Sequence, residues 1–360
     1  MKAAVLHEAN KPLVIEDVEI DSPRSREVVV RTVAAGVCHT DVHFREGANP
    51  CPMPAVLGHE SAGFVEEVGS EVTYVKPGDR VITCLSVFCG HCRYCTTGRP
   101  NLCDREGLSR SADDAPRLSM KGRPLHQFLN LSSYAERLLI HEHALVQVRE
   151  DMPLDKAALI GCGVTTGMGA VLNTAQVRAG STVAVIGCGG IGLSAIQGAV
   201  IAGANRVIAV DRITSKLQLA KEMGATDLIN ARDGDPVEQV KDLLGGGVEY
   251  SFEAVGGKET AEQAYYMLEK GGTATLIGLA PSGVKLELDA LSFLEERKLQ
   301  GSNMGSNRFR VDMPRYVDMY LTGRLKLDEM ITREIQLDEI NDAFDALLEG
   351  EVARQVILFP

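Results

Sequence analysis

The sequence predicts an α/β protein in two parts: a β-rich part, and a doubly wound parallel sheet covered by helices. Three observations carry this prediction. Short extended runs separated by turns fill residues 3 to 83, strand-like and helical runs alternate from about residue 181, and a glycine-rich turn opens the alternating region. A chain of 360 residues also has room for about two domains of ~150 residues each.

The β-rich part is predicted from extended runs that are bounded by turn signals such as Pro12, Pro23 and the segment 76–79. The runs cover residues 3–6, 13–20, 27–37, 61–69 and 79–83. The turns between them are too frequent for helices of ordinary length.

The parallel sheet is predicted from strand-like runs about twenty residues apart, with helical segments such as 215–224 between them. Its strands are expected at 182–187, 206–211, 227–230, 250–255 and 273–279. After about Gly301 the pattern predicts helices, including 337–350, and one terminal strand at 354–359.

The composition limits the kind of partner. A formal net charge of -12 disfavours a nucleic acid, because phosphate binding needs a basic face. The N-terminal residues lack a basic segment followed by an apolar run, and no stretch reaches the roughly 18 apolar residues of a membrane span. We therefore expect a cytoplasmic protein with a small-molecule partner, no nucleic acid and no membrane.

Four of the nine cysteines are closely spaced, in "CGHCRYCTTGRPNLC". Thiolates at C-x2-C spacing converge readily on one tetrahedral zinc, and Gly90 and Gly98 let the chain turn around it. Four thiolates leave no open coordination position, so the expected site is structural; a loop that is cysteine-rich by chance is the alternative. The predicted ligands are Cys89, Cys92, Cys95 and Cys103.

A dinucleotide site is predicted at "VAVIGCGGIGLSAI", where a G-x-G-x-x-G pattern follows an apolar strand and opens a helix. Its residues are Gly187, Gly189, Gly190, Ile191 and Gly192. Asp211 ends the next predicted strand, where a carboxylate accepts the ribose hydroxyls of NAD and repels a 2'-phosphate. A solvated strand-end carboxylate is the alternative for Asp211, and the adjacent Arg212 weakens the preference for NAD.

A second metal site is predicted from Cys38, His59 and Cys162. Taken singly, each is as easily a packed or surface residue. Together they supply two thiolates and an imidazole, which leave one position on a tetrahedral zinc open for a substrate oxygen.

With these motifs in place, the sequence resembles the zinc-dependent medium-chain alcohol dehydrogenases along essentially its whole length. The resemblance implies a GroES-like β catalytic domain at 1–163 and 304–360 that carries the zinc lobe 89–103, and a Rossmann NAD-binding domain at 164–303. It also implies two Zn²⁺ per chain, NAD as the cofactor, and hydride transfer from an alcohol to NAD⁺. The motifs that carry it are Cys38 with Thr40 and His43, Gly58 to Glu60, the cysteine quartet, Cys162 and the Gly187 fingerprint.

The resemblance implies roles for further residues. Thr40 passes the released proton towards His43; a helix N-cap is the alternative for Thr40, and a plain surface side chain for His43. Glu60 modulates the field of the metal and Asp41 orients the imidazole of His59, unless either is an ordinary charged residue at a turn. Cofactor contacts are implied for His39, Thr166, Ile191, Lys216 and Arg354.

Substrate and assembly are predicted from departures within the family. Leu85 stands where many members have a phenylalanine, and the Thr40 methyl excludes bulk at the carbinol carbon, so primary alcohols are expected, including long or aromatic ones. A thiol-dependent formaldehyde dehydrogenase is the alternative, although "ANPCPMPAVL" carries no acid and Gly107 stands where those members have arginine. The segment 105–132 is long, as in the dimeric class I and class III members of the family, so the resemblance implies a homodimer rather than a homotetramer.

Two further classes of protein remain as alternatives. Zinc-free quinone or enoyl reductases share the architecture and use NADPH, but lack both sets of metal ligands. A non-catalytic NAD-binding sensor would keep the fold without needing His59, Cys162 and Thr40 together.

Overall fold

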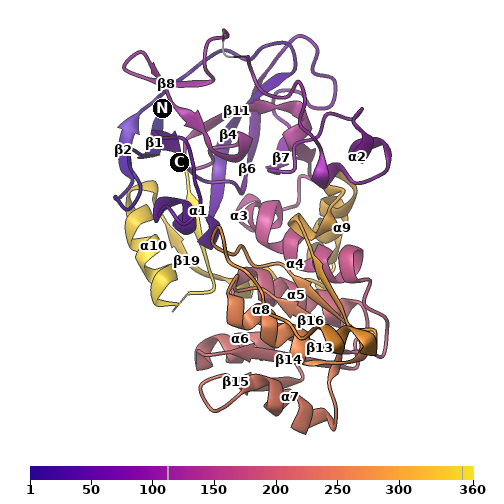
Figure 1. Ribbon diagram of the computed structural model, residues 1–360. Coiled ribbons are helices and arrows are strands. Elements are labelled where there is room, and N and C mark those ends of the chain that lie inside the picture. The colour runs from indigo at the N-terminus through magenta and orange to yellow at the C-terminus, as the bar shows by residue number, and fades with distance from the viewer. Residues whose placement is uncertain (112, 351) are drawn as a thin grey trace. The chain divides into compact units, whose positions relative to one another are not determined.

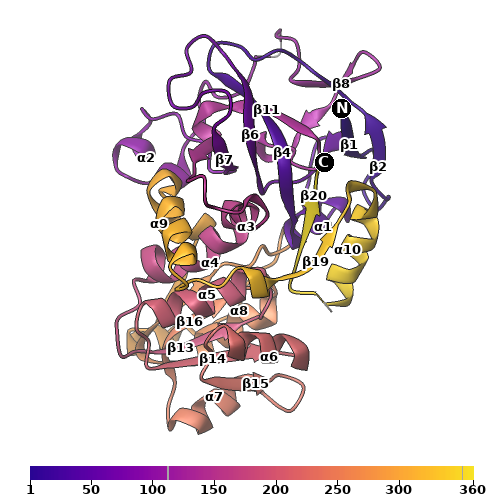
Figure 2. The ribbon, with the colours of Figure 1, turned by 180° about the vertical axis from the view of Figure 1, so that it is seen from behind.

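The computed structural model describes residues 1–111, 113–350 and 352–360. The chain divides into two compact units (Figures 1 and 2). Unit 1 consists of Met1–Cys162 and Arg308–Pro360, and unit 2 of Gly163–Asn307. The expected boundaries were 163/164 and 303/304. The second boundary differs because a Cβ atom added to Gly169 would lie 2.3 Å from the carbonyl oxygen of Gly305, so the segment around Gly305 packs within unit 2.

In the part of the chain that the structure describes, unit 1 holds three sheets. The largest has the order β12-β7-β6-β4-β20-β19, with β11 also pairing with β4. Its strands are β12 (Leu145–Gln147), β7 (Arg80–Thr83), β6 (Ser61–Val68), β4 (Glu27–Val37), β20 (Arg354–Leu358), β19 (Ile331–Ile335) and β11 (Arg137–His141). The smaller sheets contain β10 (His126–Gln127), β5 (Ala55–Val56), β1 (Lys2–Leu6) and β2 (Val14–Asp17), and β3 (Glu19–Ile20), β8 (Leu118–Met120) and β9 (Arg123–Pro124).

The helices of unit 1 are short, apart from two near the C-terminus. They are α1 (His39–Arg45), α2 (Arg93–Thr96), α3 (Leu154–Leu159), α9 (Phe309–Leu321) and α10 (Ile340–Glu349), with 3₁₀ turns η1 (Pro100–Leu102), η2 (Phe128–Asn130), η3 (Glu142–Ala144), η8 (Asp328–Met330) and η9 (Leu337–Glu339). β19 was not expected from the sequence, which indicated one terminal strand. It pairs in parallel with β20, and both strands lie beside α10 (Figure 2).

Unit 2 is built on a six-stranded parallel sheet, counted over the described residues, in the order β15-β14-β13-β16-β17-β18. This is the doubly wound order with its switch point between β13 and β16. The strands are β13 (Thr182–Ile186), β14 (Arg206–Asp211), β15 (Asp227–Asn230), β16 (Val248–Glu253), β17 (Leu268–Leu276) and β18 (Lys298–Gly301). The helical elements are α4 (Thr165–Gly169), η5 (Ala170–Ala175), α5 (Gly190–Ile201), α6 (Thr214–Glu222), α7 (Pro236–Leu244), α8 (Lys258–Tyr266), η6 (Ala290–Glu295) and η7 (Met304–Ser306).

One helical run corrects an expectation. Residues Leu154–Ala175, which include the π-helical turn η4 (Ile160–Val164), form a 22-residue run that is long and apolar enough to span a membrane by length and composition alone. Its most apolar window is 83% buried inside the protein, so the run is packed as a core element. The expectation that no stretch reaches this length was therefore wrong.

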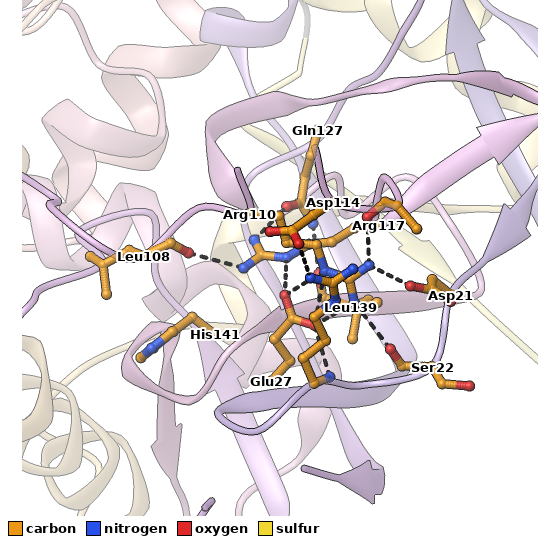
Figure 3. Close-up of polar contacts among 12 residues, drawn as sticks. Asp21, Ser22, Glu27, Leu108, Arg110, Asp114, Arg117, Gln127, Leu139 and His141 are labelled. Carbon is orange, nitrogen blue, oxygen red and sulfur yellow. Dashed lines mark hydrogen bonds and ion pairs between the residues drawn. The ribbon is translucent and has the colours of Figure 1, made fainter. Parts of the chain in front are cut away.

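A buried ion cluster ties the segment after the zinc lobe to the start of β4 (Figure 3). The carboxylate of Glu27, which is 4% exposed, accepts hydrogen bonds from Arg110 Nε at 3.0 Å and from Arg117 Nε at 2.6 Å. Arg117 also donates to the carbonyl oxygen of Leu108 and to Gln127. The start of β4 and the segment that contains Arg110 and Arg117, which are distant in the sequence, are thus joined through one carboxylate.

Candidate functional site

The three predicted ligands of the reactive metal meet in unit 1. Cys38 follows β4 and caps α1, His59 lies between β5 and β6, and Cys162 lies in η4. Their ligand atoms lie within 4.8 Å of one another, and all three residues are buried. Within the described residues, His59 Nε2 is a buried nitrogen without a hydrogen-bond partner. Two thiols and an imidazole nitrogen with no other partner fit a zinc ion.

The local backbone explains how His59 reaches this cluster. Gly58, immediately before it, has φ +90°, and a Cβ atom there would lie 2.6 Å from the backbone nitrogen of Tyr134. Both facts require glycine at this position. The amide of Gly36 donates to the carbonyl oxygen of Glu60 at 3.0 Å, which joins the His59 segment to the end of β4 beside Cys38.

The electrostatics of the cluster suit a cation. The hydrogen bond from Cys162 lowers the pKa of the Cys38 thiol well below its usual range and raises that of Cys162. Burial alone lowers the pKa of His59, but Asp41 and Cys38 raise it to about 10. The two thiols and the imidazole thus share protons in a buried site. A divalent ion that binds there displaces these protons, because metal ligands must be deprotonated.

Asp41 makes the contact with His59 that its predicted orienting role requires. His59 Nδ1 lies 3.2 Å from Asp41 Oδ1 and 3.1 Å from Oδ2, and Oδ1 also accepts the backbone N–H of Gly58 at 3.0 Å. The second oxygen, Oδ2, accepts the hydroxyl of Tyr134 at 2.9 Å. A carboxylate on Nδ1 leaves the lone pair of Nε2 for a metal.

Glu60 and Arg354 form a buried ion pair behind the cluster. Glu60 is 0% exposed and Arg354 4%. Within the residues described, Arg354 Nε has no partner. Arg354, which was predicted to contact the pyrophosphate, is thus ion-paired with Glu60 within unit 1.

Helix α1 carries the residues predicted to move the proton. Thr40 and His43 are half-buried and stand three residues apart, so they share a face of the helix. His43 Nδ1 is a buried nitrogen without a partner among the described residues, and the His39 and His43 rings are 6.0 Å apart. Cys38 rather than Thr40 is the N-cap residue, so the capping alternative for Thr40 was wrong.

The cysteine quartet also converges. The Sγ atoms of Cys89, Cys92, Cys95 and Cys103 lie within 4.8 Å of one another. Backbone N–H groups donate to these sulfurs: Cys92 N to Cys89 Sγ at 3.3 Å, and Cys89 N to Cys103 Sγ at 3.1 Å. Such hydrogen bonds stabilise thiolates. Gly90 and Gly98 have φ +88° and +78°, as the predicted tight turns require.

The glycine fingerprint lies between β13 and α5 in unit 2. A Cβ atom on Gly192 would lie 1.7 Å from the carbonyl oxygen of Gly187, and one on Gly187 would lie 2.6 Å from Val255. A Cβ atom on Gly189 would meet nothing within 4 Å. Packing therefore requires glycine at positions 187 and 192. Gly189 instead leaves open space at the N-terminus of α5, beside Gly190, where a pyrophosphate fits.

Asp211 is held at the carboxyl end of β14. Its Oδ2 atom accepts the backbone N–H of Cys188 at 2.7 Å, and Oδ1 accepts those of Arg212 and Ile213 at 2.7 and 2.9 Å. The carboxylate therefore fastens the glycine-rich turn to the next strand. Lys216 lies half-buried on α6.

Thr166 and Ile191 also lie near each other within unit 2. Thr166 is buried, and its hydroxyl donates to the sulfur of Met304 at 3.3 Å. A Cβ atom on the neighbouring Gly167 would lie 2.3 Å from the carbonyl oxygen of Ile191.

Two residues at these sites were not predicted. Tyr134 contacts Asp41, and Glu253, 1% exposed at the end of β16, accepts hydrogen bonds from Val255 N, Gly256 N and the Thr260 hydroxyl. The position of Glu253 in the otherwise apolar run "YSFEAV" was a signal that could have identified it. Tyr134 had none, because its partner is 93 residues away.

A buried three-donor metal site, a closed four-thiol site and a dinucleotide-binding sheet together define a zinc-dependent dehydrogenase. Comparison with known proteins identifies the family. Residues 24–150 match the model described as "Alcohol dehydrogenase GroES-like domain", and residues 190–321 match "Zinc-binding dehydrogenase". The class-3 alcohol dehydrogenase of Zea mays is 41% identical over 368 residues, which cover 99% of this chain and 96% of the maize protein. The chain belongs to the zinc-dependent medium-chain alcohol dehydrogenases, as the resemblance implied.

Solved structures agree. An alcohol dehydrogenase zinc-binding domain protein from Burkholderia ambifaria matches with a TM-score of 0.95 at 37% identity, covering 100% of this chain and 98% of that one. Benzyl alcohol dehydrogenase from Acinetobacter calcoaceticus matches with a TM-score of 0.94 at 32% identity, covering 100% and 99%. The expected GroES-like and Rossmann folds are confirmed.

Proposed function

We propose that the protein transfers a hydride from a primary alcohol to NAD⁺, giving the aldehyde and NADH, and catalyses the reverse reaction. The observation that carries this proposal is the cluster of Cys38, His59 and Cys162, whose ligand atoms lie within 4.8 Å of one another in a buried site. Family membership supports the reaction type.

The three residues hold the reactive zinc, and the lobe cysteines hold the structural one. When bound, Zn²⁺ supplies a Lewis acid that makes an alcohol O–H more acidic. Two thiolates neutralise the charge of the ion, so that a buried, apolar pocket retains it. Glu60, which follows His59 in the sequence, adds a negative charge next to the site. The guanidinium of Arg354 neutralises this charge.

Thr40 and His43 move the released proton. The Thr40 hydroxyl both donates and accepts hydrogen bonds. His43, one helical turn further on, carries an imidazole that both accepts and donates a proton. The Nδ1 atom of His43, which has no hydrogen-bond partner among the residues that the structure describes, supports this role.

NAD occupies the carboxyl edge of the parallel sheet. Gly189, Gly190 and the N-terminus of α5 receive the pyrophosphate, Asp211 accepts the adenosine ribose hydroxyls, and Lys216 reaches the same ribose. Thr166 and Ile191 line the nicotinamide. His39 and Arg354 contact the pyrophosphate.

The substrate class is inferred from the similar proteins and from Leu85 and Gly107. Benzyl alcohol dehydrogenase among the similar structures favours long or aromatic primary alcohols, as does Leu85, which is only partly buried. The class-3 relatives favour the alternative, a thiol-dependent formaldehyde dehydrogenase. Gly107, where an arginine is expected for that reaction, argues against it.

We also propose a cytoplasmic homodimer. All nine cysteines are free, as suits a reducing compartment. β18 forms an edge of the unit 2 sheet, and the preceding turn exposes Leu291 and Leu294, at 68% and 79%. A strand edge beside exposed leucines suits pairing with a second copy.

The test is NADH formation by the purified, zinc-loaded protein across short, long, branched and aromatic alcohols, with and without formaldehyde plus a thiol. The expected result is about two zinc ions per chain and turnover of long or aromatic primary alcohols. Turnover of the thiol adduct alone establishes the alternative, and a protein with only the lobe zinc and no turnover contradicts the proposed function.

A further inference from the structure

Tyr134 is a buried polar residue that the proposed chemistry leaves without a role. It lies between η2 and β11 and is 0% exposed. Its hydroxyl lies 2.9 Å from Asp41 Oδ2 and 3.4 Å from the carbonyl oxygen of Gly36. A hydroxyl so deep in the core needs a partner, and its shorter contact is to the carboxylate that orients His59.

Three donors share that carboxylate. Gly58 N donates to Oδ1 and the hydroxyl of Tyr134 donates to Oδ2, while His59 Nδ1 lies 3.2 Å from Oδ1 and 3.1 Å from Oδ2. Asp41 is itself 0% exposed, so water does not replace a missing donor. With Oδ1 held by the amide of Gly58 and Oδ2 held by Tyr134, the carboxylate keeps both of its oxygens beside the imidazole of His59.

The Tyr134 ring supports the same segment from its other side. A Cβ atom on Gly58 would lie 2.7 Å from Cδ1 of Tyr134, and Tyr134 N donates to the carbonyl oxygen of Leu57 at 3.0 Å. The ring packs in a core cluster with Phe344, at 6.1 Å between centroids. Tyr134 therefore contacts both the backbone that carries His59 and the acid that turns its ring.

We propose that Tyr134 is a positioning residue of the three-ligand metal site, acting through Asp41 to fix the orientation of His59. The proposal rests on the proposed zinc function. Groups that hold a metal-binding histidine typically change metal affinity about 10- to 100-fold when removed. Tyr134 acts one step further out, so a smaller effect is expected.

The variant Tyr134→Phe keeps the ring and removes only the hydroxyl. The zinc-loaded protein is mixed with a chromogenic chelator, and the release of each of its two zinc ions is followed over time. We expect Tyr134→Phe to release the three-ligand zinc roughly 3- to 10-fold faster than the unmodified protein, with unchanged release from the lobe. Substitution of the same site with Co²⁺ gives a second readout, because the visible absorption of cobalt changes with ligand geometry.

Tyr265→Phe is the matched control. Tyr265 is also 0% exposed, and its hydroxyl lies 2.8 Å from Ser292 Oγ in unit 2. We expect both zinc release rates to be unchanged in this variant. Equal acceleration by both tyrosine variants overturns the proposal, because general loosening of the fold then explains the effect.

A double-mutant cycle separates positioning from packing. If Tyr134 acts through Asp41, then Tyr134→Phe adds little to the faster release caused by Asp41→Asn. Fully additive effects, or release from Tyr134→Phe at the unmodified rate, overturn the proposal. Failure of the proposed function is a different result, since the unmodified protein then holds no zinc at the three-ligand site.

Discussion

At the scale of the residue, Cys162 has two possible contributions, to the metal and to the core, and a substitution separates them. Its sulfur lies within 4.8 Å of the sulfur of Cys38 and of a ring nitrogen of His59 in the buried site. Cys162→Ser keeps the size of the side chain and removes the thiolate. We expect the zinc content to fall from two ions to one per chain and turnover to fall by more than about 100-fold, because loss of a ligand exceeds loss of a supporting group.

The measurements are zinc analysis, NADH formation and circular dichroism. Cys84→Ala is the control, since Cys84 is equally buried in unit 1 but lies outside both clusters. Normal turnover by Cys162→Ser would show that Cys162 is not a ligand of the reactive zinc.

Asp211 makes the second prediction at this scale. Its carboxylate holds the amides of Cys188, Arg212 and Ile213 and is proposed to accept the ribose hydroxyls. In Asp211→Ser we expect the ratio of kcat/KM for NAD⁺ to that for NADP⁺ to fall about 10- to 100-fold, or about 1.4 to 2.7 kcal/mol.

The control is Asp227→Asn. Asp227 starts β15 and pairs with Arg206 at the opposite end of the sheet, so its substitution should leave the cofactor ratio unchanged. An unchanged ratio in Asp211→Ser would mean that another residue selects the cofactor.

At the scale of the element, the zinc lobe is a segment with little regular structure of its own. Its regular parts are α2 and η1, and none of the lobe cysteines is fully buried. Cys95→Ala should therefore lose the lobe zinc and lower the unfolding temperature by roughly 5 °C or more, because metal binding contributes to folding. Zinc analysis and calorimetry check this. If Cys95→Ala retained two zinc ions and an unchanged unfolding temperature, the four cysteines would not form a structural zinc site.

The Glu27 cluster (Figure 3) makes a prediction about pH. Burial by itself raises the pKa of Glu27, but hydrogen bonds from Arg110 and Arg117 lower it to about 2, from 4.5. Because the pKa is lower in the folded state, the stabilisation is complete above about pH 4.5 and is lost as the pH falls towards 2. At neutral pH it amounts to on the order of 2 to 3 kcal/mol.

Glu27→Gln should thus lower the free energy of unfolding at pH 7, with a difference from the unmodified protein that shrinks below pH 4.5. Urea unfolding at several pH values measures it. Glu66→Gln is the control, because Glu66 pairs with Arg137 at the surface, where such a pair contributes about 0 to 1 kcal/mol. A difference for Glu27→Gln that stays constant down to pH 3 would contradict the assignment.

The fold was predictable at this scale wherever a local signal existed. β13, β14 and the glycine turn follow from apolar runs and fixed spacing, and the convergence of Cys38, His59 and Cys162 was expected from the chemistry of their side chains. β19 lacks such a signal, because its sequence is mostly polar and only Ile335 is buried, so it is recognised as a strand only from its pairing with β20.

At the scale of the whole molecule, long-range contacts limit what a sequence predicts. Tyr134 and Asp41 are 93 residues apart, and Glu27 and Arg117 are 90 apart. No local period links such pairs, since their contact arises only when separate strands are placed side by side. The family resemblance predicted the architecture, whereas these supporting contacts required the structure.

Assembly is the last property at this scale. If two copies pair along β18, then Leu294 is buried twice in a symmetric dimer. Leu294→Glu removes at least ~1.5 kcal/mol per copy, so the dimer should weaken by about 100-fold or more. Leu243→Glu on α7 is the control, because Leu243 is also exposed in unit 2, at 40%, but lies away from that edge. Sedimentation velocity over a range of concentrations distinguishes the two variants. A Leu294→Glu protein that stays as large as the unmodified one places the interface elsewhere, because a buried carboxylate without a partner is not tolerated at the centre of an apolar contact.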